Sequence, residues 1–310
     1  MSAHHQERDA TVPMPSEAHD DIGLATAGRY LALRLPSACR TVLKSATYRP
    51  FLRPATYASA RLHLHEVSQH ELAPDLASLA AKHGYPFEHF PVMNYPTVAE
   101  RYLARTSEDL CLPYPTSVHF LRTADWTMES YAFPRLDIAG YVRGRIFCFL
   151  GSLLAATDGT LLHGSGFVVD GRAAAVIGPS DAGKTTAAKL VAGDHLLSDD
   201  VVAVTDIDGE PHLHATPLGR ESDGIASAPL RAIFFPRKHT SFALQPVPAR
   251  QALLRSAEEQ ADGFANLFPP YGGMAIRNLA RLFRKVPAYE LGFSLDGIDR
   301  EAIRRVLSGS

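Results

Sequence analysis

The chain has 310 residues, of which 46% are hydrophobic and 21% are charged, and its formal net charge is −2. This composition is typical of a globular protein with one large domain or two smaller ones. A charge so close to zero disfavours an extensive nucleic-acid footprint or a broad surface for anionic membranes. We therefore expect neither nucleic acid nor a membrane as a partner.

The three cysteines lie far apart in the sequence, so they show no metal-ligand spacing, and an odd number gives no simple disulfide framework. The longest apolar stretch, residues 146–156, is interrupted by glycine and serine and is too short to span a bilayer. The first 23 residues lack the apolar segment of a signal peptide. We expect a cytoplasmic protein with a flexible tail over residues 1–23.

The front part of the chain predicts a small α+β domain over residues 24–140, with no recognisable chemistry. Its expected elements are a half-buried strand, a helix and two short strands, over residues 60–67, 71–83, 117–123 and 127–133. His63 and His65 alternate with leucines on the first of these strands and have no zinc-type spacing. We interpret both histidines as surface residues.

The back part, residues 141–310, predicts a larger domain that carries nearly all the chemistry. Its first element is a helix over residues 141–157, which leads into an Asp-Gly turn. Apolar runs predict strands over residues 161–169, 173–177, 196–204, 229–235 and 286–293. Helical patterns cover residues 185–192, 251–261, 275–284 and 299–307.

The clearest motif is Gly-Pro-Ser-Asp-Ala-Gly-Lys-Thr at residues 178–185, a complete P-loop between a predicted strand and a predicted helix. The backbone N–H groups of such a loop converge on phosphates, and the helix that follows adds its positive end. Lys184 can reach the β- and γ-phosphates, and the Thr185 hydroxyl can bind Mg²⁺. We predict ATP and Mg²⁺ as cofactors. The expected nucleotide-binding residues are Gly178, Pro179, Ser180, Asp181, Ala182, Gly183, Lys184, Thr185 and Thr186.

Two adjacent acids, Asp199 and Asp200, interrupt the apolar run at residues 196–204. Carboxylates in such a setting are costly unless they meet cations or hydrogen-bond donors, and a metal-bound triphosphate supplies both. His163 lies in the predicted strand before the P-loop strand. A histidine in that position, taken alone, is more often structural than catalytic.

Together these features resemble the HPr kinase/phosphorylase group of bacterial serine kinases. The shared pattern is a His-Gly strand, a P-loop and an Asp-Asp pair, here His163-Gly164, residues 178–185 and Asp199-Asp200. The interval from the histidine to the lysine matches that family, whereas the interval from the lysine to the second aspartate is slightly shorter. Residues 230–235 and 286–291 also look like divergent HPr-kinase-like proteins of natural-product and peptide-modification gene clusters. The resemblance covers roughly residues 140–307.

The resemblance implies a role for each matched residue. Asp200 would be the base that accepts the proton of a substrate hydroxyl, and Asp199 would help to hold Mg²⁺. His163 would lie near the γ-phosphate and the acid pair, and Lys184 would bind phosphate. The expected catalytic residues are therefore His163, Lys184 and Asp200.

The remaining assignments are less direct. Glu221 occupies the region where the family places another metal-linked acid, so Thr185, Asp199 and Glu221 form the expected metal set, although Glu221 also fits a solvated loop acid. The family also implies a catalytic arginine. Arg220 and Arg277 are both candidates, and the sequence does not choose between them.

The implied fold is a mixed α+β protein. Its P-loop kinase core would be of the HPr kinase and phosphoenolpyruvate carboxykinase type, with a smaller N-terminal α+β domain. The implied function is an ATP-dependent kinase that phosphorylates a serine hydroxyl of a peptide or small protein. Two alternatives stay open: a kinase for a small serine-like metabolite, and a nucleotide-dependent regulatory module without acceptor phosphorylation. Such relatives are often oligomers, which leaves a homo-oligomer open here.

Overall fold

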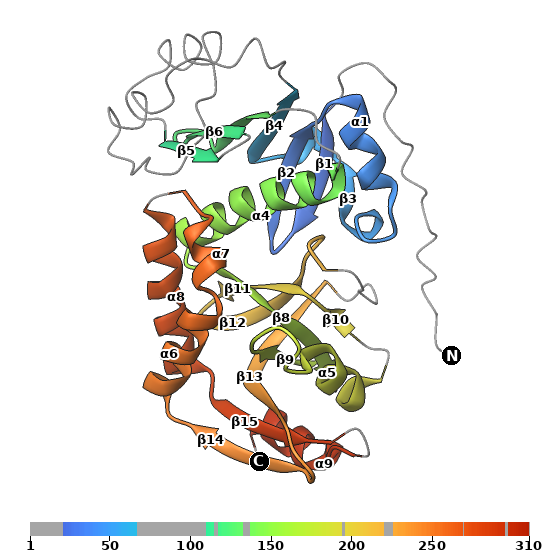
Figure 1. The fold of residues 1–310 in the computed structure, drawn as a ribbon, viewed down its shortest axis with the longest axis vertical. Coiled ribbons are helices and arrows are strands. Elements are labelled where there is room, and N and C mark those ends of the chain that lie inside the picture. Colours follow the sequence, from blue (N-terminus) through green and yellow to red (C-terminus); the bar gives the residue numbers. More distant parts are fainter. Residues whose placement is uncertain are drawn as a thin grey trace.

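The protein has a mixed α+β fold with two β-sheets, and each sheet contains both parallel and antiparallel strand pairs (Figure 1). The computed structural model describes residues 21–66, 110–114, 117–132, 137–193, 196–219, 226–268, 270–294 and 297–309. Most of the expected tail, the expected helix at residues 71–83, and the candidates Arg220 and Glu221 lie outside these ranges.

The first sheet contains seven strands in the order β3-β1-β2-β4-β7-β6-β5. Their bounds are β1 Ile22–Thr26, β2 Arg29–Arg34, β3 Leu52–Pro54, β4 Ala60–Glu66, β5 Leu110–Tyr114, β6 Ser117–Arg122 and β7 Thr127–Ala132. The three strands expected in this part are confirmed as β4, β6 and β7. The β1–β2 hairpin was not predicted. In the structure its turn residues, Ala27 and Gly28, both have positive φ, as a tight two-residue hairpin turn requires.

The second sheet contains eight strands along the order β10-β8-β11-β12-β13-β15-β14, and β9 pairs with both β13 and β8. Their bounds are β8 Thr160–Val169, β9 Arg172–Ile177, β10 Leu196–Ser198, β11 Val201–Ile207, β12 Glu210–Ala215, β13 Ser227–Lys238, β14 Ala243–Val247 and β15 Ala288–Phe293. Four predicted strands are confirmed as β8, β9, β13 and β15. The strand region predicted over residues 196–204 is confirmed in part, as β10 and the beginning of β11, but the chain leaves the sheet between them at Asp199 and Asp200.

The bounds of the α-helices are α1 Ser37–Arg40, α4 Ile138–Ala156, α5 Lys184–Ala192, α6 Ala249–Glu259, α7 Ala261–Ala265, α8 Tyr271–Lys285 and α9 Arg300–Ser308. Five predicted helices are confirmed to within a few residues at each end as α4, α5, α6, α8 and α9, whereas α1 and α7 were not predicted. Helix α4 begins three residues before its predicted start. An Asp137 carboxylate oxygen accepts the Gly140 N–H at 2.8 Å and so caps the helix.

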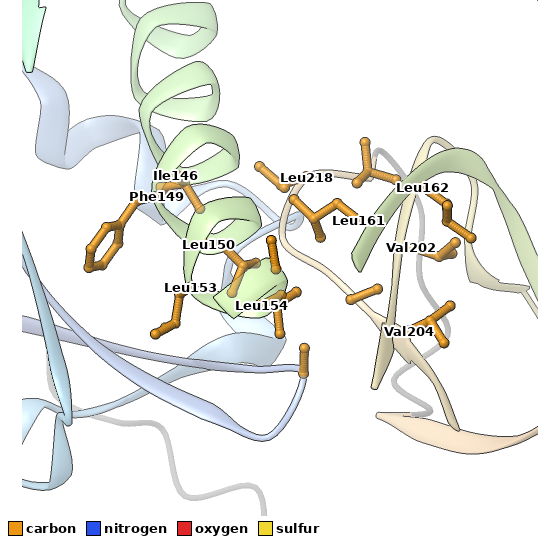
Figure 2. Packing of buried hydrophobic residues seen from close by; sticks show 14 of the residues in the cluster. Ile146, Phe149, Leu150, Leu153, Leu154, Leu161, Leu162, Val202, Val204 and Leu218 are labelled. Carbon is orange, nitrogen blue, oxygen red and sulfur yellow. The ribbon is translucent and has the colours of Figure 1, made fainter. Parts of the chain in front are cut away.

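Helix α4 lies between the two sheets, and a single buried apolar cluster contains side chains from both sheets and from α4. Figure 2 shows Leu150 and Leu154 on the side of Leu161 in β8, whereas Phe149 lies on the other side of the helix. Burying each such side chain fully contributes about 1.5–3 kcal/mol relative to leaving it in water. Packing on two sides therefore fixes the position of α4 and of every polar group that it carries.

The burial of α4 between the two sheets accounts for its apolar composition. Among the described residues, it is the one helix with a length and mean hydropathy, 1.3, that would suit a membrane span, and 61% of that stretch is buried inside the protein.

Candidate active site

The P-loop connects β9 to α5, as expected from the sequence. Gly183 has φ 90°, and a Cβ there would lie 2.9 Å from Cζ of Phe293, so the position favours glycine both by backbone conformation and by space. Helix α5 begins at Lys184, one residue before its predicted start, and ends at Gly193 as predicted. The N-terminus of α5 thus follows directly on the loop, and a helix N-terminus in this position favours an anion.

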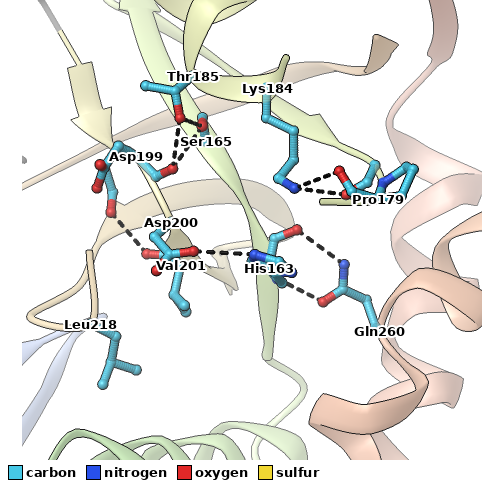
Figure 3. Close-up of polar contacts among 12 residues, drawn as sticks. His163, Ser165, Pro179, Lys184, Thr185, Asp199, Asp200, Val201, Leu218 and Gln260 are labelled. Atoms are coloured by element: carbon cyan, nitrogen blue, oxygen red, sulfur yellow. Dashed lines mark hydrogen bonds and ion pairs between the residues drawn. The ribbon is translucent and has the colours of Figure 1, made fainter. Parts of the chain in front are cut away.

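The Lys184 side chain is buried against the loop. Its ammonium group donates hydrogen bonds to the carbonyl oxygens of Gly178 and Pro179, both at 2.9 Å (Figure 3). Burial lowers the pKa of Lys184, and the nearby carboxylate of Asp200 opposes that shift. Among the described residues, Lys184 forms no ion pair within 4.0 Å. A buried ammonium group held by neutral carbonyl groups alone has a strong electrostatic preference for an added anion.

Thr185 connects the P-loop to the acid pair. Its Oγ1 donates to the Asp199 carbonyl oxygen at 3.2 Å and lies 3.2 Å from Oγ of Ser165 in β8. The Ser165 hydroxyl donates to the same Asp199 carbonyl at 2.9 Å. The structure therefore places Thr185 beside the backbone of Asp199, through its carbonyl oxygen and not through the carboxylate that was predicted to bind the metal.

The Asp199-Asp200 segment lies opposite Gly164 and Ser165, at the point where the second sheet is interrupted. Gly164 donates its N–H to the Asp200 carbonyl at 2.9 Å. A Cβ on Gly164 would lie only 2.7 Å from the Val176 carbonyl oxygen, so glycine allows β9 to approach β8 here. The His-Gly pair thus has a structural reason for its glycine, and the interruption turns Asp200 toward His163.

Asp200 is held by two cationic or donor side chains. Nε2 of His163 lies 3.1 Å from Oδ1 of Asp200, and the Arg143 guanidinium pairs with Oδ2. Arg143 also donates from Nε and Nη2 to the Leu218 carbonyl, at 2.9 and 2.5 Å. The hydrogen bond from His163, together with Arg143, outweighs burial and holds the pKa of Asp200 well below its usual range. Asp200 is therefore a fixed, ionised carboxylate.

Gln260, between α6 and α7, holds the His163 backbone. Its Oε1 accepts the His163 N–H at 2.6 Å, and its Nε2 donates to the His163 carbonyl at 3.2 Å. The Gln260 side chain is buried, and its amide offers the same donor and acceptor as a peptide group. It thereby takes the place of a neighbouring strand beside β8, just beyond the last β8–β9 pair at Gly164 and Ile177, and fixes the position from which His163 reaches Asp200.

Sequence reasoning missed both Arg143 and Gln260. Of the two arginine candidates it named, Arg277 is exposed on α8 and has no hydrogen bond or ion pair with the site in the described parts of the chain. Arg220 lies outside the described residues, as does Glu221. The available signal for Arg143 was its charge in a long, mainly apolar helix, since such residues usually have a polar partner, but Arg145 in the same helix gives the same signal.

A pocket of about 770 Å³ opens beside the P-loop. Its volume lies within the usual range of small-molecule sites. Five of the predicted nucleotide-binding residues line it, together with residues of β13, β15 and the segments that follow these strands: Asp181, Gly183, Lys184, Thr185, Thr186, Lys238, His239, Phe293 and Ser294. Lys184 and Thr185 line this pocket, and Thr185 also contacts the Asp199 backbone, whereas His163, Asp200 and Arg143 are not among the lining residues.

Comparison with known proteins gives no further guide to this arrangement. No family model matches the sequence, and no curated protein matches it significantly.

Proposed function

We propose that this protein is an ATP-dependent kinase that transfers the γ-phosphate to a serine hydroxyl of a peptide or small protein. The observation that carries the proposal is the contact between two groups of residues. The P-loop, with Lys184 and Thr185, is joined through the Asp199 backbone to the cluster of Asp200, His163 and Arg143. A phosphate-binding loop and a carboxylate near the acceptor hydroxyl are two of the components that kinases combine with a metal ion for phosphoryl transfer.

We also propose that the core is of the HPr kinase and phosphoenolpyruvate carboxykinase type. In support, β9, the strand that leads into the P-loop, pairs antiparallel with β8 and parallel with β13. A doubly wound P-loop sheet would place parallel strands on both sides of β9. The mixed pairing therefore argues against the common P-loop sheet and agrees with the resemblance in sequence.

The residues near the loop fit ATP and Mg²⁺. Lys184 is a buried cation without a carboxylate partner in the described structure, and the α5 N-terminus lies beside it. The loop amides and Lys184 would bind the phosphates, while Thr185 and Asp199 would hold the metal ion, with Glu221 as a further ligand. Bound MgATP supplies the γ-phosphoryl group and neutralises part of its charge.

Asp200 would accept the proton of the acceptor hydroxyl. A carboxylate with a depressed pKa is a weak base, but the proton leaves late in a loose phosphoryl-transfer transition state, so orientation matters more than base strength. General-base assistance of this kind is typically worth about 10²–10⁴-fold. His163 and Arg143 act as positioning residues, because each contacts one oxygen of the Asp200 carboxylate.

The test is transfer of a labelled γ-phosphate. The full chain is incubated with labelled MgATP and a set of serine peptides, their alanine counterparts, and free serine. Mass spectrometry then locates the modified hydroxyl. The proposal expects label on serine peptides and none on the alanine controls.

Two results would favour the alternatives. Label on free serine alone would indicate a small-molecule kinase. ATP binding with neither turnover nor transfer to any acceptor would contradict the kinase proposal and favour a nucleotide-dependent regulatory module.

The cytoplasmic location, the possible homo-oligomer and the exclusion of nucleic-acid and membrane partners stay predictions from the sequence.

A further inference from the structure

A second polar cluster lies in the first sheet and consists of His63, His65 and Glu129. Strands β4 and β7 are parallel neighbours, and their register places His63 directly beside Glu129. His65 is two residues further along β4 and therefore faces the same side of the sheet. Nδ1 of His63 lies 3.0 Å from Oε1 of Glu129, and Nε2 of His65 lies 2.5 Å from Oε2. One donor atom from each of the three residues lies within 4.8 Å of the other two.

The side chains of the cluster are fixed by their neighbours. Leu62 and Leu64 point to the opposite face of β4 and belong to the buried cluster that contains α4. The His65 ring stacks on the buried Tyr131 ring, with centroids 4.6 Å apart. His63 and Glu129 are nearly buried, so the interpretation of His63 as a surface residue is wrong, whereas 35% of the His65 side chain is exposed. The cluster is thus a preorganised set of donors with one side accessible from solvent.

Packing alone gives a poor reason for this cluster. Nε2 of His63 is buried without a hydrogen-bond partner in the described part of the chain. Such an unsatisfied atom costs about 1–3 kcal/mol. A carboxylate between two imidazoles in a nearly buried position is a common arrangement of metal ligands.

We propose that His63, His65 and Glu129 bind a divalent transition-metal ion of the Zn²⁺ class. Two imidazoles and a carboxylate suit such ions, whereas Mg²⁺ prefers oxygen ligands alone. In a tetrahedral zinc site the donor atoms lie about 3.3 Å apart, so the two carboxylate–imidazole distances need to open by less than about 1 Å. Three protein ligands leave one position for water or an external ligand on the accessible side of His65. This site lies in the sheet that does not contain the P-loop, and its ligands differ from those of the proposed nucleotide metal.

The test uses Zn²⁺ and Co²⁺ as the probes. The full chain carries His4→Gln and His5→Gln, so that the N-terminal histidine pair cannot bind the ions. It is titrated without nucleotide, with a competing chelating dye for Zn²⁺ and visible absorption for Co²⁺. We expect one ion per chain and a Co²⁺ spectrum of low coordination number.

Glu129→Gln removes the charged ligand but keeps hydrogen-bonding groups beside both histidines, and it should weaken binding by at least about 10–100-fold.

The control variant is His212→Gln, at a half-buried histidine of the second sheet outside the cluster, and it should bind the ion as tightly as the parent chain. His65→Gln, at the more exposed ligand, provides a second test if Glu129→Gln does not fold. Circular dichroism establishes the fold of each variant. Equal affinity in the parent chain and in a folded cluster variant would overturn the proposal, and so would the absence of one-to-one binding in the parent chain.

Discussion

The two polar clusters of this protein are built in different ways. The cluster at the P-loop depends on a short segment: residues 178–185 supply the loop, the helix start and the lysine, and Asp199 and Asp200 follow soon after α5. The cluster of His63, His65 and Glu129 joins two histidines to a glutamate that lies 64 and 66 residues further along the chain, and it has no local motif. A site made by a contiguous loop can be read from sequence, whereas a site made by strand register emerges only once the sheet is known.

Lys184→Ala should have the largest effect on the P-loop cluster. The substitution removes the buried ammonium group, so we expect weaker nucleotide binding and a loss of ATP turnover of about 10²–10³-fold or more. Turnover of labelled ATP and nucleotide binding are the measurements. Lys189→Ala, on the exposed face of the same helix, is the control and should be near wild type. Wild-type turnover in Lys184→Ala would contradict the P-loop assignment.

Asp200→Asn should separate binding from transfer. The amide is close in shape to the carboxylate but cannot accept the proton, so we expect nearly normal ATP binding and a loss of transfer of about 10²–10⁴-fold. Phosphopeptide formation is measured beside nucleotide affinity. Undiminished phosphopeptide from Asp200→Asn would remove its proposed role as the base.

Arg143→Ala should have a smaller effect that depends on pH. Arg143 helps to keep the pKa of Asp200 low, and activity that needs ionised Asp200 is present above that pKa and lost as pH falls through it. Removing the guanidinium raises the pKa, so the acidic limb of the rate profile should move to higher pH by about one unit or more. Arg143→Lys should restore part of the shift. A profile unchanged in Arg143→Ala would show that the ion pair has no part in positioning Asp200.

Gln260→Ala should affect stability more than chemistry. It leaves the N–H and carbonyl groups of His163 without their partners, at a cost of about 1–3 kcal/mol in the free energy of unfolding. Urea denaturation measures this, with Gln251→Ala on the exposed face of α6 as the control. Equal stability of the two variants would indicate that the Gln260 bridge contributes little.

The sequence predicted most of the second sheet because its strands are apolar and are bounded by clear turns, such as Asp170-Gly171, where both residues have positive φ. It did not predict the interruption at Asp199 and Asp200, because the apolar run appears continuous on both sides of them. Strands β12 and β14 were missed as well. Each contains a proline and little apolar alternation, and each is defined by its neighbours in the sheet.

The same reasoning explains which site residues were found. Lys184, Thr185, Asp199, Asp200 and His163 belong to patterns of local spacing, and the structure brings them together. Three missed residues contact partners that are far away in the sequence. Arg143 lies 57 positions from Asp200, and Gln260 lies 97 positions from His163. Glu129 lies 66 positions from His63. Nothing in a single sequence fixes such pairs, because α4 packing and strand register determine them.

The most direct measurement is a structure of the full chain with Mg²⁺ and a non-hydrolysable ATP analogue. The account predicts that the triphosphate lies along residues 178–185 with Lys184 on its β- and γ-phosphates, and that Asp200 faces the γ-phosphate with space for a hydroxyl between them. A nucleotide bound elsewhere, or a γ-phosphate directed away from Asp200, would contradict the account.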